Sequence, residues 1–167
     1  MPRPIRYQSR YPLPAAKLYT VLVDPDYLRA KLHEVGGEDS ELVDLTVDPD
    51  GARIILRQGV SQDVIPGLIR RVLRGDLVIE RTETWRRVGP GHYDGTVSVR
   101  VKDAPGTIGG ALSLVDVDDG SASEYGLDGS AKVDVPLLGG RIEALVADQV
   151  VKLMEREGQF TADWLAR

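Results

Sequence analysis

The stretch Gly139–Leu165 carries the strongest helical pattern in the chain, and it constrains the fold more than any other feature. With Ile142 at zero and an advance of about 100° per residue, apolar side chains fall within one stripe less than a quarter-turn wide. The stripe contains Val146, Val150, Leu153, Phe160 and Trp164. A helix of this length spans roughly 40 Å, which is enough to cross a whole sheet. We therefore expect a long C-terminal helix that packs along a sheet.

Two polar residues belong to this helix stripe. Glu157 falls inside it, and Gln149 lies at its edge. A carboxylate among apolar side chains is unfavourable unless it is paired, exposed or used by a ligand. Glu157 is therefore a candidate polar anchor at the mouth of a pocket. The alternative is a bend or fraying of the helix near Gly158 that lets the carboxylate reach water.

The rest of the chain has mostly the period of two that is typical of strands. Arg3–Tyr11 alternates and predicts a first strand, which Pro12 and Pro14 end. Two short helices follow, over residues 15–23 and from Pro25 to about residue 35, with Asp24 as N-cap of the second. Further strands are predicted at 41–47, 52–58, 77–87, 93–102, 107–117 and 123–135. Turn residues separate nearly every pair, so sequential strands can pair as an antiparallel meander.

One helical segment, residues 64–74, interrupts the strands. Its apolar stripe faces away from Arg70, Arg71 and Arg74. This segment could act as a movable lid or entrance, with arginines that attract an anionic head group. The alternative is a structural helix with a solvated polar face.

Alternation predicts which strand residues face the helix. The inward positions include Arg81, Glu83, Trp85, Tyr93, Gly95, Val97, Val99, Gly110, Leu112, Tyr125 and Gly129. Three adjacent strands thus each place a glycine on the face that should be packed. These glycines either leave room for a ligand or permit strong sheet curvature, bulges or close approach of the helix. Arg81 and Glu83 point inward if the register holds and could then pair with each other or with Glu157, whereas a bulge would turn them out.

The order of elements resembles the helix-grip fold, and the chain looks like a member of the START-like superfamily. The opening "YPLPAAKLYTVLVDPDYLRAKL" and the ending "VPLLGGRIEALVADQVVKLMEREGQFTADWL" carry the resemblance, which is most similar to an uncharacterised bacterial family. It implies an α+β fold in which residues 1–167 form a single START-like domain. In that domain a curved, antiparallel, seven-stranded sheet wraps around the long C-terminal helix. It also implies a cavity between sheet and helix.

Composition narrows the function classes. Acidic residues number 26 against 21 basic ones, with both signs mixed along the chain, which argues against nucleic acid as a partner. The absence of cysteine excludes disulfides, a thiolate zinc site and a cysteine nucleophile. The only histidines are His33 and His92, so we expect no metal site and no cofactor. With no signal peptide or membrane-spanning stretch in the pattern, we expect a cytoplasmic protein.

These observations favour a non-enzymatic carrier or sensor of a hydrophobic or amphipathic small molecule, lipid-like or polyketide-like. The residues predicted to line its pocket are Arg81, Glu83, Trp85, Tyr93, Val97, Val99, Gly110, Leu112, Tyr125, Gly129, Gln149, Leu153, Glu157 and Phe160. One alternative is an enzyme resembling polyketide cyclases or aromatases, with Glu157, Arg81 or a tyrosine positioning the substrate. Another is a ligand-free interaction module of co-chaperone type. The oligomeric state stays open, and a homodimer is one option.

Overall fold

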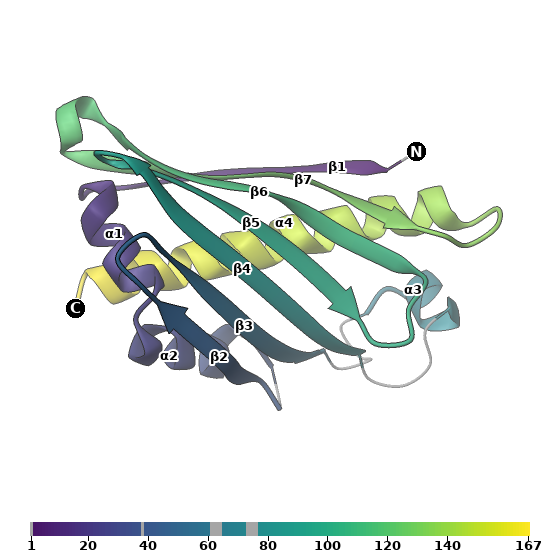
Figure 1. Ribbon diagram of the computed structural model, residues 1–167. Coiled ribbons are helices and arrows are strands. Elements are labelled where there is room, and N and C mark those ends of the chain that lie inside the picture. The colour runs from purple at the N-terminus through teal and green to yellow at the C-terminus, as the bar shows by residue number, and fades with distance from the viewer. Residues whose placement is uncertain (1, 38, 61–64, 73–76) are drawn as a thin grey trace.

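The computed structural model describes residues 2–37, 39–60, 65–72 and 77–167 (Figure 1). Within these residues seven strands form one antiparallel sheet in the order β1-β7-β6-β5-β4-β3-β2. The strands are β1 (Arg3–Tyr11), β2 (Glu41–Val47), β3 (Gly51–Val60), β4 (Leu77–Gly89), β5 (His92–Val101), β6 (Gly106–Val117) and β7 (Ala122–Val133). The helices are α1 (Ala15–Leu22), α2 (Pro25–Val35), α3 (Gly67–Val72) and α4 (Gly139–Leu165), with a 3₁₀ turn, η2 (Asp118–Gly120), between β6 and β7.

The curved sheet wraps around α4, which runs along its concave face (Figure 1). The helices α1 and α2 lie at the end of the sheet where α4 finishes, and α3 lies at the opposite end. This arrangement confirms the predicted helix-grip α+β fold. The helix predicted over residues 64–74 is observed as Gly67–Val72, while residues 64, 73 and 74 lie outside the described residues.

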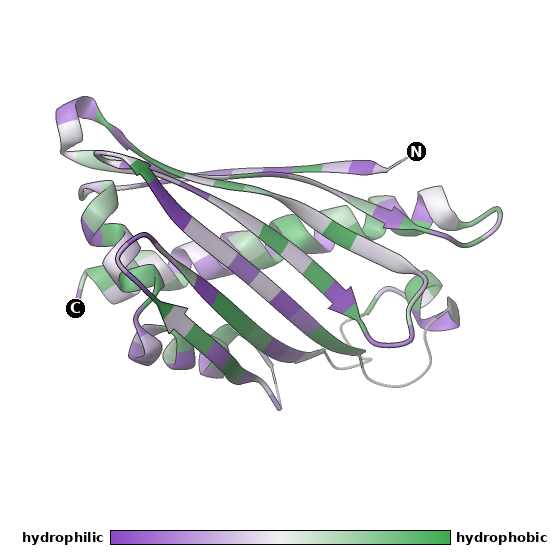
Figure 2. Cartoon of the chain, in the orientation of Figure 1, coloured by the Kyte–Doolittle hydropathy of each residue, from purple (hydrophilic) through white to green (hydrophobic). Residues whose placement is uncertain are grey.

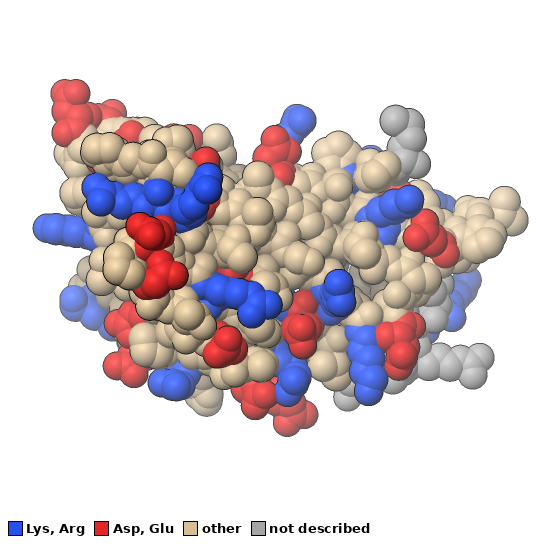
Figure 3. Space-filling model, in the orientation of Figure 1, with Lys and Arg blue, Asp and Glu red and all other residues tan. Residues whose placement is uncertain are grey.

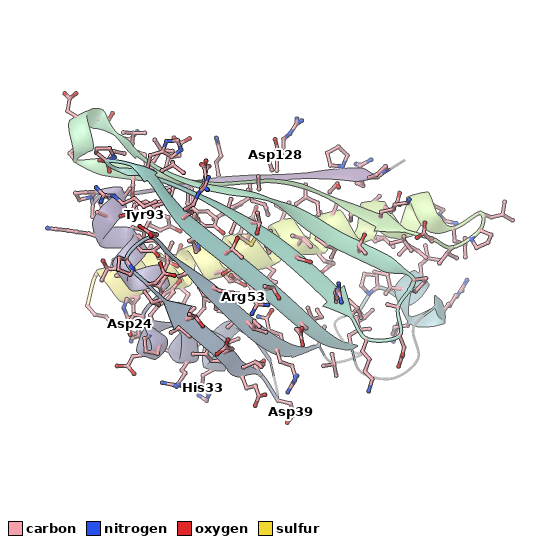
Figure 4. All side chains as sticks on the ribbon, in the orientation of Figure 1. Asp24, His33, Asp39, Arg53, Tyr93 and Asp128 are labelled. Atoms are coloured by element: carbon pink, nitrogen blue, oxygen red, sulfur yellow. The ribbon has the colours of Figure 1, made fainter. Side chains whose placement is uncertain are left out.

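Alternation along the strands separates a packed face from an exposed face (Figure 2). Ile54 and Leu127 are buried, whereas their chain neighbours Arg53 and Asp128, labelled in Figure 4, are exposed. On the face of the molecule shown in Figure 3, lysine and arginine side chains alternate with aspartate and glutamate. That face therefore offers no continuous basic surface for nucleic acid.

Side-chain hydrogen bonds fix the starts of three helices. The Ala15 N–H at the start of α1 donates to Asp116 Oδ1 of β6 over 2.7 Å. In α2, Asp24 acts as N-cap and accepts from the Asp26 N–H at 2.9 Å. The start of α4 is tied to the end of β7, because the Val133 N–H donates to the buried Glu143 Oε2 at 2.8 Å.

The described side chains pack in two separate clusters. The larger cluster lies between the sheet, α1, α2 and α4 and contains Leu18, Tyr27, Leu56, Trp85, Leu114 and Phe160, among others. The smaller cluster consists of Ile65, Ile69 and Ile142 with half-buried apolar neighbours, and it joins α3 to the first turn of α4. Val146 is half-buried and packs against both clusters.

Candidate functional site

A small cavity lies where the middle of the sheet, α1, α2 and the second half of α4 meet. Its volume is about 30 Å³. It is lined by Tyr7, Tyr11, Leu22, Tyr27, Lys31, Arg81, Glu83, Trp85, Tyr125, Met154, Glu157, Gly158 and Thr161. Because a water molecule needs roughly 10–15 Å³ of such volume, the cavity holds about two waters and no whole lipid.

A cluster of four charged side chains forms the polar side of this cavity. Arg81 makes a two-pronged contact with Glu157, from Nη1 to Oε2 at 2.8 Å and from Nη2 to Oε1 at 3.0 Å. The same guanidinium donates through Nε and Nη2 to Glu83 Oε1, at 3.1 and 2.6 Å. Lys31 Nζ lies 3.5 Å from Glu157 Oε1. All four residues are at most 6% exposed, so we call Lys31, Arg81, Glu83 and Glu157 the buried charge cluster.

The local sequence explains how these side chains meet. Arg81 and Glu83 are two residues apart in β4, so the pleat puts both on the concave face. Lys31 follows Tyr27 by one helical turn, on the buried side of α2. Glu157 lies on the face of α4 that packs against the sheet. The bulge that would have turned Arg81 and Glu83 outward is not present in the continuous β3–β4 and β4–β5 registers at these positions.

Electrostatics keep the cluster ionised although it is buried. Burial by itself raises the pKa of Glu157, but the nearby Arg81 and then Lys31 outweigh it, and its pKa falls from 4.5 to about 2. Burial by itself lowers the pKa of Lys31, yet the Glu157 carboxylate, together with Tyr27 and Glu83, outweighs this and raises the pKa above its usual value. For Arg81, Glu157 and Glu83 likewise overcome the effect of burial, and the pKa is raised. The salt bridges of Glu157 with Arg81 and Lys31 therefore stay charged at neutral pH.

Hydroxyl groups extend the network around the charges. Thr161 Oγ1 donates to the Glu157 carbonyl at 2.9 Å and lies 2.6 Å from the Tyr27 hydroxyl. A threonine hydroxyl has one hydrogen, so Tyr27 is the donor in the second bond. Burial raises the pKa of Tyr27 and of Tyr11, which keeps both phenols protonated.

Tyr125 contributes a neutral hydroxyl to the cavity. Burial, followed by the nearby Glu83 carboxylate, raises its pKa well above the usual value. Its ring lies between Tyr7 and Trp85, with centroid distances of 6.3 and 6.1 Å. The hydroxyl is thus a protonated group that can both donate and accept at the cavity.

Beyond the charge cluster, the concave face becomes apolar towards the α3 end. Arg81 pairs across the sheet with Val99, and Ile79 pairs with Val101. Ile79, Val99 and Val101 lie on the inward side, yet they are only half-buried. The inward face therefore joins a buried polar end to an incompletely covered apolar surface.

The structure brings five of the fourteen predicted lining residues together at the cavity, namely Arg81, Glu83, Trp85, Tyr125 and Glu157. The remaining nine lie elsewhere. Tyr93 stacks on Tyr19 with centroids 4.3 Å apart, and Phe160 packs against Tyr27 and Trp164. Leu112 is buried in the larger core cluster. Val97, Val99, Gly110, Gly129, Gln149 and Leu153 are half-buried outside the cavity lining.

The inward glycines serve close approach and do not open a cavity. A Cβ at Gly110 would lie 2.6 Å from Gly129 Cα and 2.7 Å from the Asp128 carbonyl of the paired strand. A Cβ at Gly95 would lie 3.0 Å from the Trp85 ring. The interpretation that these glycines leave room for a ligand is therefore wrong, and at Gly110 and Gly95 the missing side chain allows close approach to the neighbouring strand.

The predicted stripe of α4 is displaced from the observed one. Leu153 and Gln149 are only half-buried, whereas Met154 and Thr161 are buried together with Glu157. The helix packs against β1, β7 and α2 at once, so its buried surface is wider than one apolar stripe. This surface includes Met154 in place of Leu153. Glu157 itself is 5% exposed, so the proposed bend near Gly158 that would lead it to water is wrong. Gly158 instead makes room for the Tyr7 hydroxyl, which a Cβ there would meet.

Sequence reasoning missed several cavity residues, above all Lys31. Its signal was present, because Tyr27, Leu28, Lys31 and Leu32 occupy one helical face in α2. A lysine on the buried face of a helix predicts a partner carboxylate in the interior. Thr161 follows Glu157 by four residues, which similarly places it on the same side of α4.

The described part of the chain contains neither a metal site nor a membrane helix. No group of three or more histidine, aspartate or glutamate side chains there could hold a metal ion. Nor is any helix in the described ranges long and apolar enough to cross a bilayer.

Comparison with solved structures places this geometry in a known class. A protein from Chromobacterium violaceum is 12% identical, covers 98% of this chain and 97% of its own, and has a TM-score of 0.58. A protein from Thermus thermophilus is 16% identical, with coverage of 95% and 96% and a TM-score of 0.55. Ara h 8.0201 is 15% identical, with coverage of 98% and 99% and a TM-score of 0.52. These similarities show the fold alone: the chain has the helix-grip fold, the class of fold that its sequence predicted.

Within that class, the chain belongs to the family described as "Protein of unknown function (DUF2505)", whose model matches residues 6–165. A relative in Mycobacterium tuberculosis (strain ATCC 25618 / H37Rv), described as an uncharacterized protein, is 27% identical over 170 residues. The similarity covers 99% of this chain and 98% of the relative. The family assignment thus confirms the predicted similarity to an uncharacterised bacterial family.

Proposed function

We propose that the protein binds an amphipathic small molecule between the sheet and α4, as a non-enzymatic carrier or sensor. The observation that carries this proposal is the composition of the concave face. A buried polar end at Arg81 and Tyr125 continues directly into half-buried apolar side chains at Val99 and Val101. A molecule with one polar and one apolar end matches that order.

The size of the cavity defines how such a molecule would bind. A volume of about 30 Å³ admits one small polar group. The apolar remainder would then lie along Ile79, Val99 and Val101, where side chains on the inward face are not yet fully covered. Covering them would remove apolar surface from water, which contributes roughly 25 cal/mol per Å².

A cyclase-like reaction finds less support from the same residues. Arg81, Glu83 and Glu157 are buried and in contact, which keeps them within reach of one ligand atom. However, a general base works best with a pKa near the working pH, and the pKa of Glu157 is about 2. The charged groups are occupied by one another, so we favour binding over catalysis.

Extraction of the purified protein tests the proposal. We expect native mass spectrometry to show a bound small molecule that organic solvent releases. The variant Val99→Trp fills the apolar face beside Arg81 and should reduce the bound fraction at least several-fold. The matched control is Ser98→Trp, because Ser98 directly precedes Val99 in β5 and is exposed on the opposite face of the sheet.

Two results would contradict the proposal. One is wild-type protein that carries no ligand and binds no member of a panel of amphipathic probes. The other is equal occupancy in Val99→Trp, Ser98→Trp and wild type, which would place the ligand away from the concave face.

A further inference from the structure

The buried charge cluster also restricts the kind of ligand. We infer that the polar end of the ligand is uncharged, a hydroxyl or carbonyl group that hydrogen-bonds to Tyr125, and is neither a carboxylate nor an ammonium. This inference rests on the proposed function and names the ligand class for the same site.

The first step is charge balance. Among the described residues that line the cavity, Lys31 and Arg81 carry positive charge, and Glu83 and Glu157 carry negative charge. Arg81 contacts both carboxylates at 2.6–3.1 Å, and Lys31 contacts Glu157 at 3.5 Å. Each charge therefore already has an opposite charge beside it, and the set sums to zero.

The second step is the effect of adding a fifth charge. An anionic ligand would have to compete with Glu157 or Glu83 for Arg81, and the displaced carboxylate would remain buried without its partner. A cationic ligand would compete with Arg81 or Lys31 in the same way. An unpaired charge in a buried site is strongly unfavourable, whereas a neutral oxygen leaves every existing pair intact.

The third step is the group that remains to receive the ligand. The Tyr125 hydroxyl is at the cavity and stays protonated, so it can donate one hydrogen bond to a ligand oxygen and accept another. The cavity volume of about 30 Å³ suits one hydroxyl or carbonyl group. The apolar surface that begins at Val99 receives the hydrocarbon part.

Three probes with the same chain and different polar ends test the inference at pH 7: 1-decanol below its solubility limit, and decanoate and decylammonium below their critical micelle concentrations. The tryptophan at the cavity, Trp85, provides the signal. All measurements use the variant Trp164→Phe, because it leaves Trp85 as the only tryptophan in the chain. We expect 1-decanol to bind at least about ten-fold more tightly than either charged probe.

Two substitutions and one control variant in this background locate the effect. Tyr125→Phe removes the neutral hydroxyl and should weaken 1-decanol binding roughly five-fold. Its matched control is Tyr93→Phe, because Tyr93 is also buried on the concave face but lies outside the cavity lining, so affinity should not change. Glu83→Gln gives the cluster a net positive charge and should improve decanoate binding relative to 1-decanol.

The possible outcomes separate the inference from the proposal on which it depends. If decanoate or decylammonium binds as tightly as 1-decanol, the inference is overturned while the proposed function stands. If no probe binds and no endogenous ligand is found, the proposed function fails and the inference fails with it. If Glu83→Gln does not fold, the comparison of the three probes on the Trp164→Phe protein still decides the result.

Discussion

Glu157 illustrates how a single charged residue can occupy the interior of this fold. It accepts from Arg81 on two oxygens, contacts Lys31, and accepts from Thr161 on its backbone carbonyl. A buried ion pair adds little net stability compared with apolar packing, but removal of one member is strongly unfavourable because its partners stay buried. The cluster therefore specifies how α2, β4 and α4 fit together.

At the scale of single residues, Glu157→Gln is expected to lower the free energy of unfolding by about 3 kcal/mol at pH 7. The substitution keeps the size of the side chain but leaves Lys31 without its carboxylate. Urea denaturation followed by circular dichroism measures the change. Glu155→Gln is the control, because Glu155 lies on the same helix and is exposed, and it should stay within about 0.5 kcal/mol of wild type. Equal stability of the two variants would contradict the role assigned to the cluster.

At the scale of elements, the pairing of β6 with β7 depends on glycines at a site of close backbone approach. Gly110 lies opposite Gly129 in the register, and a Cβ at Gly110 would contact backbone atoms that have no freedom to rotate away. The preceding Gly109 differs, because a Cβ there would meet only the Val97 carbonyl at 3.4 Å. Adjacent residues of one strand thus offer a matched pair.

We expect Gly110→Ala to destabilise the protein by about 2 kcal/mol, because the strands must move apart. Gly109→Ala should change stability by less than about 0.5 kcal/mol, since 3.4 Å is close to ordinary contact. Thermal and urea unfolding of both variants measure the difference. Equal effects would show that curvature at this point does not depend on the missing side chain of Gly110.

At the scale of the whole molecule, the Glu157 pKa links stability to acidity. The folded-state pKa is about 2, against 4.5 for an unperturbed carboxyl, so the unfolded chain takes up the proton first as the pH falls. The stabilisation from this group is complete above pH 4.5 and is lost as the pH decreases towards 2. Its size is about 3 kcal/mol, because each pKa unit corresponds to about 1.4 kcal/mol.

Unfolding measured between about pH 5 and about pH 2.5 should show this loss in wild type and a smaller one in Glu157→Gln. The loss should persist at moderate salt, because a buried pair is weakly screened. Identical pH profiles for the two proteins would mean that other carboxylates govern acid unfolding.

The sequence was sufficient for most of the fold because its signals are local and repeated. Arg3–Tyr11, Glu41–Val47 and Gly139–Leu165 are observed with their predicted bounds. Period-two alternation also placed Arg81 and Glu83 on the inward face.

The site was less predictable, because it depends on where separate elements meet. The helical periodicity of α4 predicted that Leu153, and not Met154, lies on the buried face. Periodicity carries no information about the simultaneous contacts of α4 with β1 and α2. Nor can periodicity measure distance across the sheet, so the pairing of Lys31 with Glu157, which are far apart in the sequence, was missed.

The smaller cluster of Ile65, Ile69 and Ile142 has a kinetic consequence for the molecule. This cluster joins α3 to α4 among the described core residues, and Val146 is the side chain that packs against both it and the larger core. Detachment of α3 therefore requires only local unfolding, with a free energy well below that of the global transition. Amide hydrogens of α3 should exchange with solvent sooner than those of β7 or α4.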